Sequence, residues 1–464
     1  ALPDTMKDDD DKMQLDRTDI DCDFSTKFVT QQKSLAAQYA DVYYLRLMTL
    51  KHGLLDEARS KCKVYKPANR ILDLEVGQKS MIVGTLLKVM KFRPNILDEF
   101  NKDVENISNE SFKRNHYSSD DDYVIMEDES GRVNLRFPED NNMARMLVTG
   151  VILAAYGQLG EDGTFQVDEL QNPGLPPQIP TGKMEGEPKI ILVSGLELGN
   201  PDSDPLAVDM LVDYITGNLG GVETFQESAK VAKVIIAGSS CFFSSENRSS
   251  ALYRKADPSQ TRANQKETAN PVRELDLLLT RLSSSVAVDI LPGAGDPSNV
   301  FMPQQPFHNC LLPSANTYSS FRPTTNPYES RIFEDPEAKE EGVIIIGTSG
   351  QNVEDIQRCS EVEDPLDVMQ NLLQWRHLAP TAPDTLPCFP VKDEDPFILP
   401  HCPHIFFAGN QKTFGSRTID GEKGQKSLLV SVPSFSRTKT AVEVDVRTLT
   451  ATPISFGTEA FHQD

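Results

Sequence analysis

Glu197 and Asp296 are the carboxylates best placed to hold a metal ion, because each lies in a loop that follows a strand-like run. Five short apolar runs are followed by loops of glycine and small polar residues, and the runs lie at 189–193, 234–237, 288–291, 343–346 and 405–408. In layered α/β proteins the carboxyl ends of strands converge on one crevice, where sites are assembled. The sequence therefore predicts a crevice at which these loops meet.

The order and spacing of the loops resemble those of the calcineurin-like metallophosphoesterases. The resemblance implies two divalent cations that polarise a phosphate and generate a hydroxide, which requires histidine and carboxylate ligands. Only Glu197 and Asp296 could still bind a cation, and the other matching positions carry Gly195, Ser239, Ala294, Gly295, Ser349, Asn410 and Lys412. We therefore interpret the crevice as an inactive site, with no catalytic residue, no metal and no cofactor.

Six sequence segments narrow the resemblance to one family. They lie at 192–196, 291–293, 302–306, 325–328, 347–352 and 376–385. In this order they resemble the second, regulatory B-subunits of DNA polymerase delta, in which an oligonucleotide-binding (OB) barrel precedes an inactive phosphoesterase domain. The resemblance extends from about residue 30 to the C-terminus.

The phrase at 376–385 is the longest and forms a family-signature loop. Prolines fix φ, and an aspartate favours a turn, so a rigid loop explains the pattern. Contact with a partner explains it equally well. The residues in question are Arg376, His377, Pro380, Thr381, Pro383 and Asp384.

The chain is strongly acidic, with a formal net charge of -23 and a sequence pI near 4.8. Proteins that neutralise many phosphates carry a basic stripe, so tight binding of nucleic acid by the whole surface is disfavoured. No apolar run reaches about 18 residues, the length that a membrane span needs. The seven cysteines form no Cys-x-x-Cys pair, which fits packed thiols in a reducing compartment.

The strand and helix patterns, together with the resemblance, predict an α/β and β protein in five parts. Helical spacing of apolar residues at 31–62 predicts a helix that packs on its own domain. Five prolines and three glycines at 172–188 are typical of a linker. The predicted parts are a tag-like, disordered leader (1–23), a helical N-terminal segment (24–66), an OB-fold domain (67–171), the linker (172–188) and an inactivated phosphoesterase domain with a layered β-sandwich and flanking helices (189–464).

Five strand-like runs predict the barrel, at 80–87, 123–127, 133–137, 147–156 and 164–168, with a long polar excursion at 95–119. Such barrels can stack single-stranded bases on aromatic residues in a basic groove. Here the acidic runs at 120–122 and 127–129 would repel phosphates, so core packing or protein contact is the preferred interpretation.

Strands alternate with helices in the larger domain, as crossover connections require. The predicted helices lie at 207–216 and 272–284, with a polar loop at 245–270 between them. Later strand-like runs at 427–432 and 440–447 would complete a second layer.

The resemblance implies a non-catalytic scaffold in the polymerase delta holoenzyme, which acts in DNA replication and repair. It implies that the cysteine-rich C-terminal region of the catalytic subunit docks on the barrel and phosphoesterase domains. It also implies that the N-terminal domain of the third, clamp-binding subunit docks mainly on the barrel. It also allows a second catalytic partner, from the translesion polymerase zeta. It implies a nuclear protein that meets DNA only indirectly and no membrane.

Two alternatives of other classes stay open. A residual metal-dependent phosphodiesterase or nuclease would use Glu197 and Asp296, whereas a single-stranded DNA-binding OB protein would need a basic barrel face. If the crevice is structural instead, Lys412 is expected to lie near both carboxylates and neutralise them, because buried like charges are costly unless paired.

Overall fold

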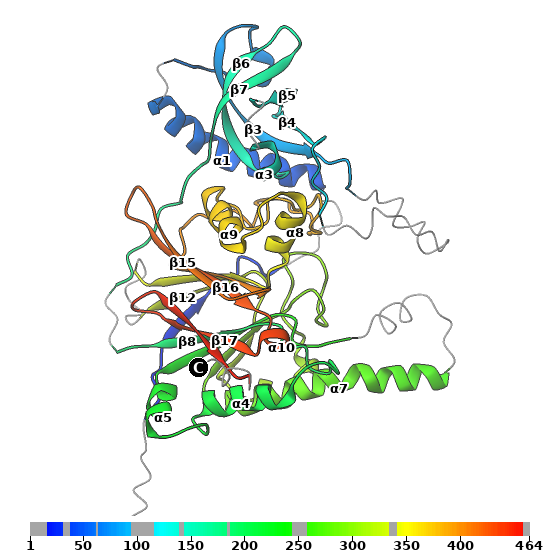
Figure 1. The fold of residues 1–464 in the computed structure, drawn as a ribbon, viewed down its shortest axis with the longest axis vertical. Helices are drawn as coiled ribbons and strands as arrows, with labels where there is room; N and C mark the ends of the chain where they lie inside the picture. Colours follow the sequence, from blue (N-terminus) through cyan, green and yellow to red (C-terminus); the bar gives the residue numbers. More distant parts are fainter. Residues whose placement is uncertain are drawn as a thin grey trace, which may run out of the picture.

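The computed structural model describes residues 16–30, 38–61, 64–93, 116–138, 143–182, 186–243, 258–333 and 341–457. Over these residues the chain forms a barrel at one end and a layered body of two sheets at the other (Figure 1). The acidic run near the N-terminus and nearly all of the polar excursion at 95–119 lie outside the described residues. No described helix is both long and apolar enough to cross a membrane.

The barrel has strand order β2-β3-β4-β5-β7-β6 and is closed by pairing of β3 with β6. Residues in β5 alternate between buried and exposed, as a strand with one face on a core requires. The strands are β2 (Lys66–Pro67), β3 (Lys79–Val89), β4 (Tyr123–Glu127), β5 (Arg132–Arg136), β6 (Ile152–Leu159) and β7 (Thr164–Gln171).

One predicted strand of the barrel begins too early. The run at 147–156 is mostly apolar, with Thr149 and Gly150 inside it, but β6 begins only at Ile152. The short helix α3 (Met143–Met146) and a turn at Gly150, whose φ is 88°, precede it. Buried residues of a turn and of a strand are both apolar, so hydropathy alone could not separate them.

The predicted N-terminal helix is α1 (Tyr39–Lys61), which packs on the outside of the barrel. Its residues Leu47, Leu50 and Leu54 belong to one buried cluster with Met81 and Val83 of β3. This fits the prediction of a helix on its own domain. Residues 31–37 of that prediction lie outside the described chain.

The first sheet of the body has the order β11-β10-β9-β8-β17-β18. Its four strands from β11 to β8 are parallel, and β17 and β18 continue the sheet in antiparallel pairing. The strands are β8 (Lys189–Val193), β9 (Val231–Ala237), β10 (Ala287–Leu291), β11 (Phe321–Pro323), β17 (Thr440–Asp445) and β18 (Thr450–Ser455).

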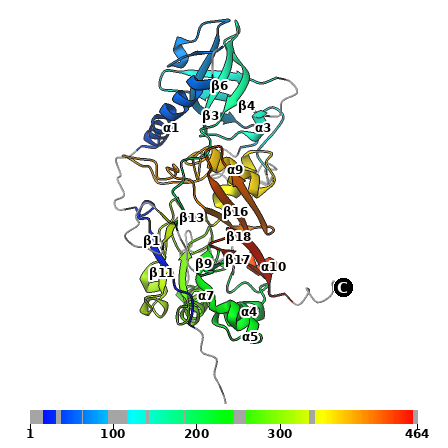
Figure 2. The same cartoon turned by 90° about the vertical axis from the view of Figure 1, so that its left-hand side faces the viewer.

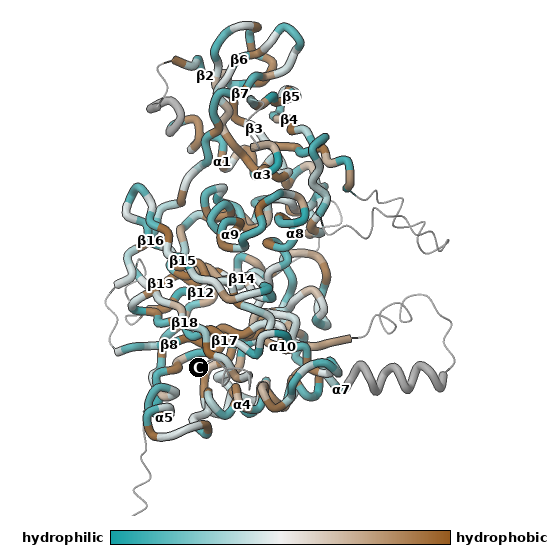
Figure 3. The backbone as a smooth tube through the Cα atoms, viewed as in Figure 1, coloured by the Kyte–Doolittle hydropathy of each residue, from teal (hydrophilic) through white to brown (hydrophobic). Residues whose placement is uncertain are grey.

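The second sheet has the order β1-β12-β13-β14-β16-β15 and faces the first across an apolar core. Parallel pairing joins β13, β14 and β16, which carry much of the hydrophobic colour in the body (Figure 3). The strands are β1 (Asp21–Phe24), β12 (Tyr328–Phe333), β13 (Val343–Thr348), β14 (Ile405–Gln411), β15 (Gly415–Asp420) and β16 (Lys426–Pro433).

Helices cover the outer faces of both sheets. Side chains of α4 (Pro205–Thr216) and α7 (Pro258–Ser283) pack on the first sheet, with α5 (Val222–Ala229) beside α4. On the second sheet lie α8 (Gln351–Cys359) and α9 (Pro365–Gln374), and the one-turn helix α10 (Phe435–Thr438) follows β16. Both α4 and α9 start with an aspartate cap followed by proline, a strong start signal.

Two predictions about irregular segments are wrong. The leader expected at 1–23 ends in ordered chain, because β1 pairs antiparallel with β12 and Arg17 donates to the carbonyl oxygens of Val231 and Ile215. The loop expected at 245–270 is helical from Pro258, where α7 begins. Residues 244–257 lie outside the described chain.

The barrel and the body share one continuous hydrophobic core. Both views place α9 between the barrel and the sheets (Figures 1 and 2). Leu86 and Phe165 of the barrel belong to the same buried cluster as Val353 of α8, Leu372 of α9 and Phe406 of β14. The two parts therefore form one packed unit.

Candidate functional site

The structure brings the five strand-ending loops into direct contact. The backbone N–H of Gly195 donates to the carbonyl oxygen of Gly238 at 2.9 Å, and that of Glu197 donates to Ser239 at 3.0 Å. A Cβ at Gly293 would lie 2.4 Å from the nitrogen of Ser239, so these loops pack backbone to backbone. The predicted positions are buried at Gly195, Asp296 and Ser349, half-buried at Glu197, Ser239, Gly295 and Asn410, and exposed at Ala294 and Lys412.

Asn410 joins three of the loops through its amide groups. Its backbone N–H donates to the hydroxyl of Ser194 at 2.8 Å. Its side-chain Nδ2 donates to the carbonyl oxygens of Ala237 at 3.2 Å and Ser349 at 2.8 Å. Asn410 has a φ of 57°, in the left-handed region, which asparagine tolerates better than most residues. Hydrogen bonds of Asn410 thus connect the loops that meet at the crevice.

A second amide cluster extends this network. The side chain of Asn326 is fully buried and donates to Gln304 Oε1, Ser349 Oγ and Gln351 Oε1, each at 2.8 Å. Gln304 in turn donates to the carbonyl oxygen of Gly293 at 3.2 Å. A buried polar group costs free energy unless it is hydrogen-bonded. This cluster satisfies its members internally.

Asp296 is buried and its carboxylate accepts backbone N–H groups. Oδ1 accepts from Ser240 at 2.8 Å and Cys241 at 2.9 Å, and Oδ2 accepts from Gly293 at 2.8 Å. Burial raises the pKa of Asp296 to about 6, and the backbone hydrogen bonds act in the opposite direction. These donors occupy the oxygens that a cation would need.

The residues at the crevice do not fit the two cations that a phosphoesterase would hold. Beside the saturated Asp296, Glu197 is the only other carboxylate among the predicted positions, and it accepts a hydrogen bond from Asn200 at 2.8 Å. Within the described ranges, no group of three or more histidine, cysteine, aspartate or glutamate residues is arranged to hold a metal ion.

The role expected for Lys412 is wrong. Its side chain is exposed, whereas Asp296, which it was expected to neutralise, is buried. Backbone N–H groups donate to the carboxylate of Asp296 instead. In addition, β14 carries a register shift between Ala408 and Gln411 just before the lysine. Bulges of this kind turn side chains to a new direction.

The family-signature loop encloses a buried ion pair between the barrel end and the body. Arg46 of α1 is fully buried, and its Nε lies 2.9 Å from Asp395 Oδ2. The same carboxylate oxygen lies 2.9 Å from His377 Nε2. Arg46 also donates to the carbonyl oxygens of Pro380 at 2.7 Å and Ala382 at 3.0 Å. Burial acts to raise the pKa of Asp395, but His377 and Arg46 hold it below its ordinary value.

The other polar groups of the loop also bond within the chain. Thr381 and Thr385 both donate to the buried carboxylate of Asp355. Asp384 pairs with Arg93 at 2.8 Å, and Arg376 donates to the carbonyl oxygen of Gly174 at 2.8 Å. Pro383 is half-buried. These contacts favour the rigid-loop interpretation of the signature phrase over a direct contact with a partner.

His377 should make stability depend on pH. Burial lowers its pKa to about 4, and Arg46 acts in the same direction. Because this is below the unfolded value of about 6.5, its contribution is fully present above pH 6.5 and is lost as the pH falls towards 4. We expect the group to remove about 3 kcal/mol from the free energy of unfolding over this window.

Urea unfolding of wild type and His377→Gln at a series of pH values would measure this dependence. Asp296, with its raised pKa, acts with the opposite sign between pH 4 and 6, and His404, whose pKa burial also lowers to about 4, acts with the same sign. Both remain in the variant, so the difference between the two curves isolates His377. Parallel curves would contradict the prediction.

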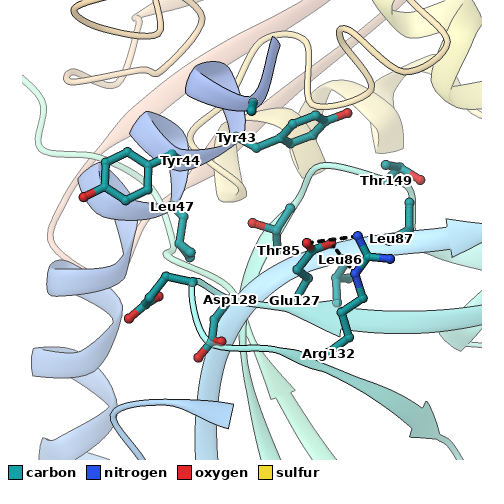
Figure 4. Close-up of a pocket in the computed structure, with 12 residues that line it drawn as sticks. Tyr43, Tyr44, Leu47, Thr85, Leu86, Leu87, Glu127, Asp128, Arg132 and Thr149 are labelled. Carbon is teal, nitrogen blue, oxygen red and sulfur yellow. Dashed lines mark hydrogen bonds and ion pairs between the residues drawn. The ribbon is translucent and has the colours of Figure 1, made fainter. Parts of the chain in front are cut away.

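An apolar groove lies where α1 crosses the barrel. It has a volume of about 390 Å³, and Tyr43, Tyr44 and Leu47 of α1 form one side (Figure 4). Leu87 of β3 forms part of the other side, and Arg132 pairs with Glu127 at the rim. Burial raises the pKa of Tyr43 to about 12, so its hydroxyl stays neutral at physiological pH. The groove can accept apolar side chains of another molecule.

Sequence reasoning missed the residues that hold these sites together. Arg46 and Asp395 are 349 positions apart, and Asn326 lies 23 positions from Ser349. A lone arginine within an apolar helical stripe was the available signal for Arg46. Asn326 and Gln304 lie within quoted family phrases, but nothing local indicated that they face the crevice.

Comparison with known proteins supplies two family matches. The family of DNA polymerase alpha/epsilon B-subunits matches residues 190–416. A family described as DNA polymerase delta subunit OB-fold domain matches residues 38–170, which contain α1 and the barrel.

Whole-chain relatives agree with both matches. The DNA polymerase delta small subunit of Arabidopsis thaliana is 38% identical over 91% of this chain and 92% of its own length. That of Oryza sativa subsp. japonica is 36% identical over 92% and 95%. DNA polymerase delta subunit 2 of Drosophila melanogaster is 33% identical over 91% and 94%.

Proposed function

We propose that this chain, which belongs to the family of DNA polymerase delta small subunits, serves that polymerase as a rigid, non-catalytic scaffold. The observation that carries the proposal is the crevice, where Asn410 and the Asn326 cluster bond the loops together and Asp296 accepts backbone N–H groups. Such a crevice offers no open metal position, which hydrolysis by metal-bound water would need.

The rigidity has a physical source. The barrel and the body share one hydrophobic core, and the buried Arg46 bonds to the signature loop of the body. A surface held in this way can orient partners relative to one another, because little conformational entropy is lost when they bind. In our proposal the body, from 189 onwards, is a phosphoesterase-type sandwich that has kept its frame, and 172–188 is its connection to the OB-fold domain at 67–171.

Within this proposal the partners are the other subunits of polymerase delta. The cysteine-rich C-terminal region of the catalytic subunit and the third, clamp-binding subunit would each dock on the scaffold, and the catalytic subunit of polymerase zeta would be an alternative partner. The protein would work in the nucleus and contact DNA only through these partners. Co-expression of the full chain with each polymerase delta subunit, followed by size-exclusion chromatography, tests the proposal. A chain that elutes alone in every combination would refute it.

The proposed loss of the metal ligands gives a separate prediction about metal content and hydrolytic activity. The purified chain should contain no stoichiometric divalent metal and should not hydrolyse phosphodiesters in manganese, because the predicted ligand positions hold Gly195, Ser239 and Asn410. Elemental analysis and a bis-p-nitrophenyl phosphate assay would measure both properties. Two bound metal ions, or an activity that Asp296→Ala abolishes, would instead establish the residual phosphodiesterase.

A further inference from the structure

One cysteine differs from the packed thiols that the sequence predicts. Cys310 is exposed, whereas the other five described cysteines are buried or half-buried. Those five are Cys22, Cys241, Cys359, Cys388 and Cys402, and Cys62 lies outside the described residues. Burial raises the pKa of all five thiols, so they stay protonated at physiological pH. The thiolate is the reactive form of cysteine. Among the described cysteines, Cys310 is therefore the one that is open to reagents in solvent.

An exposed histidine, His308, lies directly beside this thiol. Its Nδ1 is 2.9 Å from Cys310 Sγ and also accepts the backbone N–H of Cys310, at 3.3 Å. Because Nδ1 accepts this N–H, it carries a lone pair, and the proton of the neutral ring lies on Nε2. The thiol can therefore donate its proton to Nδ1. A thiol within hydrogen-bond reach of a histidine base is the arrangement that activates a cysteine as a nucleophile.

The loop that carries this pair is fixed on the body. Phe307 and Leu312, on either side of the pair, are buried in the hydrophobic cluster of the first sheet. Asn316 donates to the carbonyl oxygen of Leu312 at 2.8 Å. The buried carboxylate of Asp276, on α7, accepts two backbone N–H groups further along the loop. Because the loop is anchored at both ends, the imidazole and the thiol are held together at the surface.

The charges around the pair favour an anionic reagent. The whole chain has a formal net charge of -23, which repels anions from most of the surface. From 297 to 321, however, the sequence contains no aspartate, glutamate, lysine or arginine, and His308 is the one side chain there that can become positive. Asp276, which faces this loop from α7, is buried and hydrogen-bonded to backbone N–H groups. A small anion can therefore approach Cys310 with little repulsion.

A metal ion is a poorer match for the pair. Histidine and cysteine are both zinc ligands, but a structural zinc site uses four of them and a catalytic site three. Within the described ranges, no third histidine, cysteine, aspartate or glutamate joins His308 and Cys310 in a group that could hold a metal ion. Nucleophilic chemistry at sulfur is the use that this geometry supports.

We propose that Cys310 is a site of reversible modification by small disulfides such as glutathione disulfide, with His308 as the base. In the reaction the thiol gives its proton to Nδ1, and the sulfur electron pair attacks one sulfur of the disulfide. The S–S bond of the reagent breaks, and a new S–S bond joins Cys310 to one glutathione. The second glutathione leaves as a thiolate and takes the proton from His308. The cysteine is thereby oxidised and the departing glutathione is reduced.

This modification is independent of the proposed scaffold function. In a reducing compartment, disulfides on proteins are usually transient and sense the redox state. An excess of glutathione thiol would reverse the exchange, because a mixed disulfide with glutathione is a reversible form of cysteine.

Mass-spectrometric mapping of the reduced full-length chain, after timed exposure to glutathione disulfide at pH 7, tests the site. Cys310 should be modified about tenfold faster than any other cysteine, Cys62 included. Cys310→Ser should remove this fast reaction, and dithiothreitol should reverse it in wild type. Faster modification of any other cysteine would overturn the assignment.

His308→Asn tests the role of the base. Asparagine can still accept the backbone N–H of Cys310 as a helix cap, but its amide cannot take the thiol proton. We expect Cys310 in this variant to react about tenfold more slowly. His401→Asn is the matched control, because it changes another exposed histidine of the body and should react at the wild-type rate. Equal rates in His308→Asn and wild type would overturn the proposed pair.

Unfolded wild type gives a second measurement that does not depend on a variant. In urea the loop no longer holds the imidazole against the thiol, so Cys310 should react more slowly than in the folded chain, although it is fully accessible. If His308→Asn does not fold, this comparison still decides the outcome. A Cys310 that reacts equally fast or faster in urea would refute activation by the fold.

Discussion

Replacing Arg46 by methionine is expected to lower the free energy of unfolding by about 3–5 kcal/mol, because it leaves the carboxylate of Asp395 buried without its cation. Arg46 is fully buried and makes four hydrogen bonds, including those to Pro380 and Ala382. Methionine can fill part of the space but offers no donor. Urea unfolding at pH 7 would measure the change.

Two further variants show where the loss originates. Arg281→Met removes an arginine that also pairs with two aspartates, but its side chain is 50% exposed, so we expect a change below about 1 kcal/mol. Arg46→Met with Asp395→Asn removes the stranded charge and should cost less than the sum of the single changes. An exposed ion pair contributes at most about 1 kcal/mol. If the free energy of unfolding of Arg46→Met were within about 1 kcal/mol of the wild-type value, the buried-pair argument would be contradicted.

Arg46 also shows where sequence reasoning stops. The strands at 189–193 and 405–408 could be predicted because their signal is local, a short apolar run that ends at glycine or small polar residues. The pairing of Arg46 with Asp395 joins residues 349 positions apart. A single sequence shows no periodicity across such a distance, so a charged residue in a helix is read as solvated.

The direction in which a side chain points was a second feature that the sequence did not predict. The strand predicted at 405–408 continues to Gln411, so most of the loop expected after it belongs to β14. A register shift between Ala408 and Gln411 and the left-handed φ of Asn410 decide which residue points into the crevice. Asn410 turns inward and Lys412 stays in solvent. Spacing along a sequence assumes regular pleating, and a bulge breaks that assumption.

Short edge strands and polar helices were a third kind of element that the sequence did not predict. β1 has only four residues, too few for a clear alternation of apolar and polar side chains. Its place in the sheet becomes clear only from a tertiary contact, in which the ring centroids of Phe24 and Tyr328 lie 6.0 Å apart. The early part of α7 is polar and was therefore read as loop. In both cases tertiary contact rather than intrinsic pattern determines the element.

Replacing Asn410 by alanine is expected to cost about 3 kcal/mol, the second large effect. The variant loses the donor to the carbonyl oxygens of Ala237 and Ser349, and an unsatisfied buried acceptor costs about 1–3 kcal/mol. A further contribution of about 1–2 kcal/mol comes from alanine at a φ of 57°. Thermal and urea unfolding would measure the sum.

Three substitutions at this position separate its causes. Asn410→Gly removes the donor but adopts the left-handed φ freely, so it should be more stable than Asn410→Ala by about 1 kcal/mol. Asn410→Asp tolerates the φ but places a carboxylate against two carbonyl oxygens, so it should be the least stable. Asn410→His introduces the histidine that the proposed phosphoesterase resemblance would place at this position. If hydrogen bonds have replaced the metal ions, this histidine should destabilise the fold and bind no manganese, because Asp296 remains saturated by backbone donors. An Asn410→His variant that binds manganese and regains stability would show that the metal site is still latent.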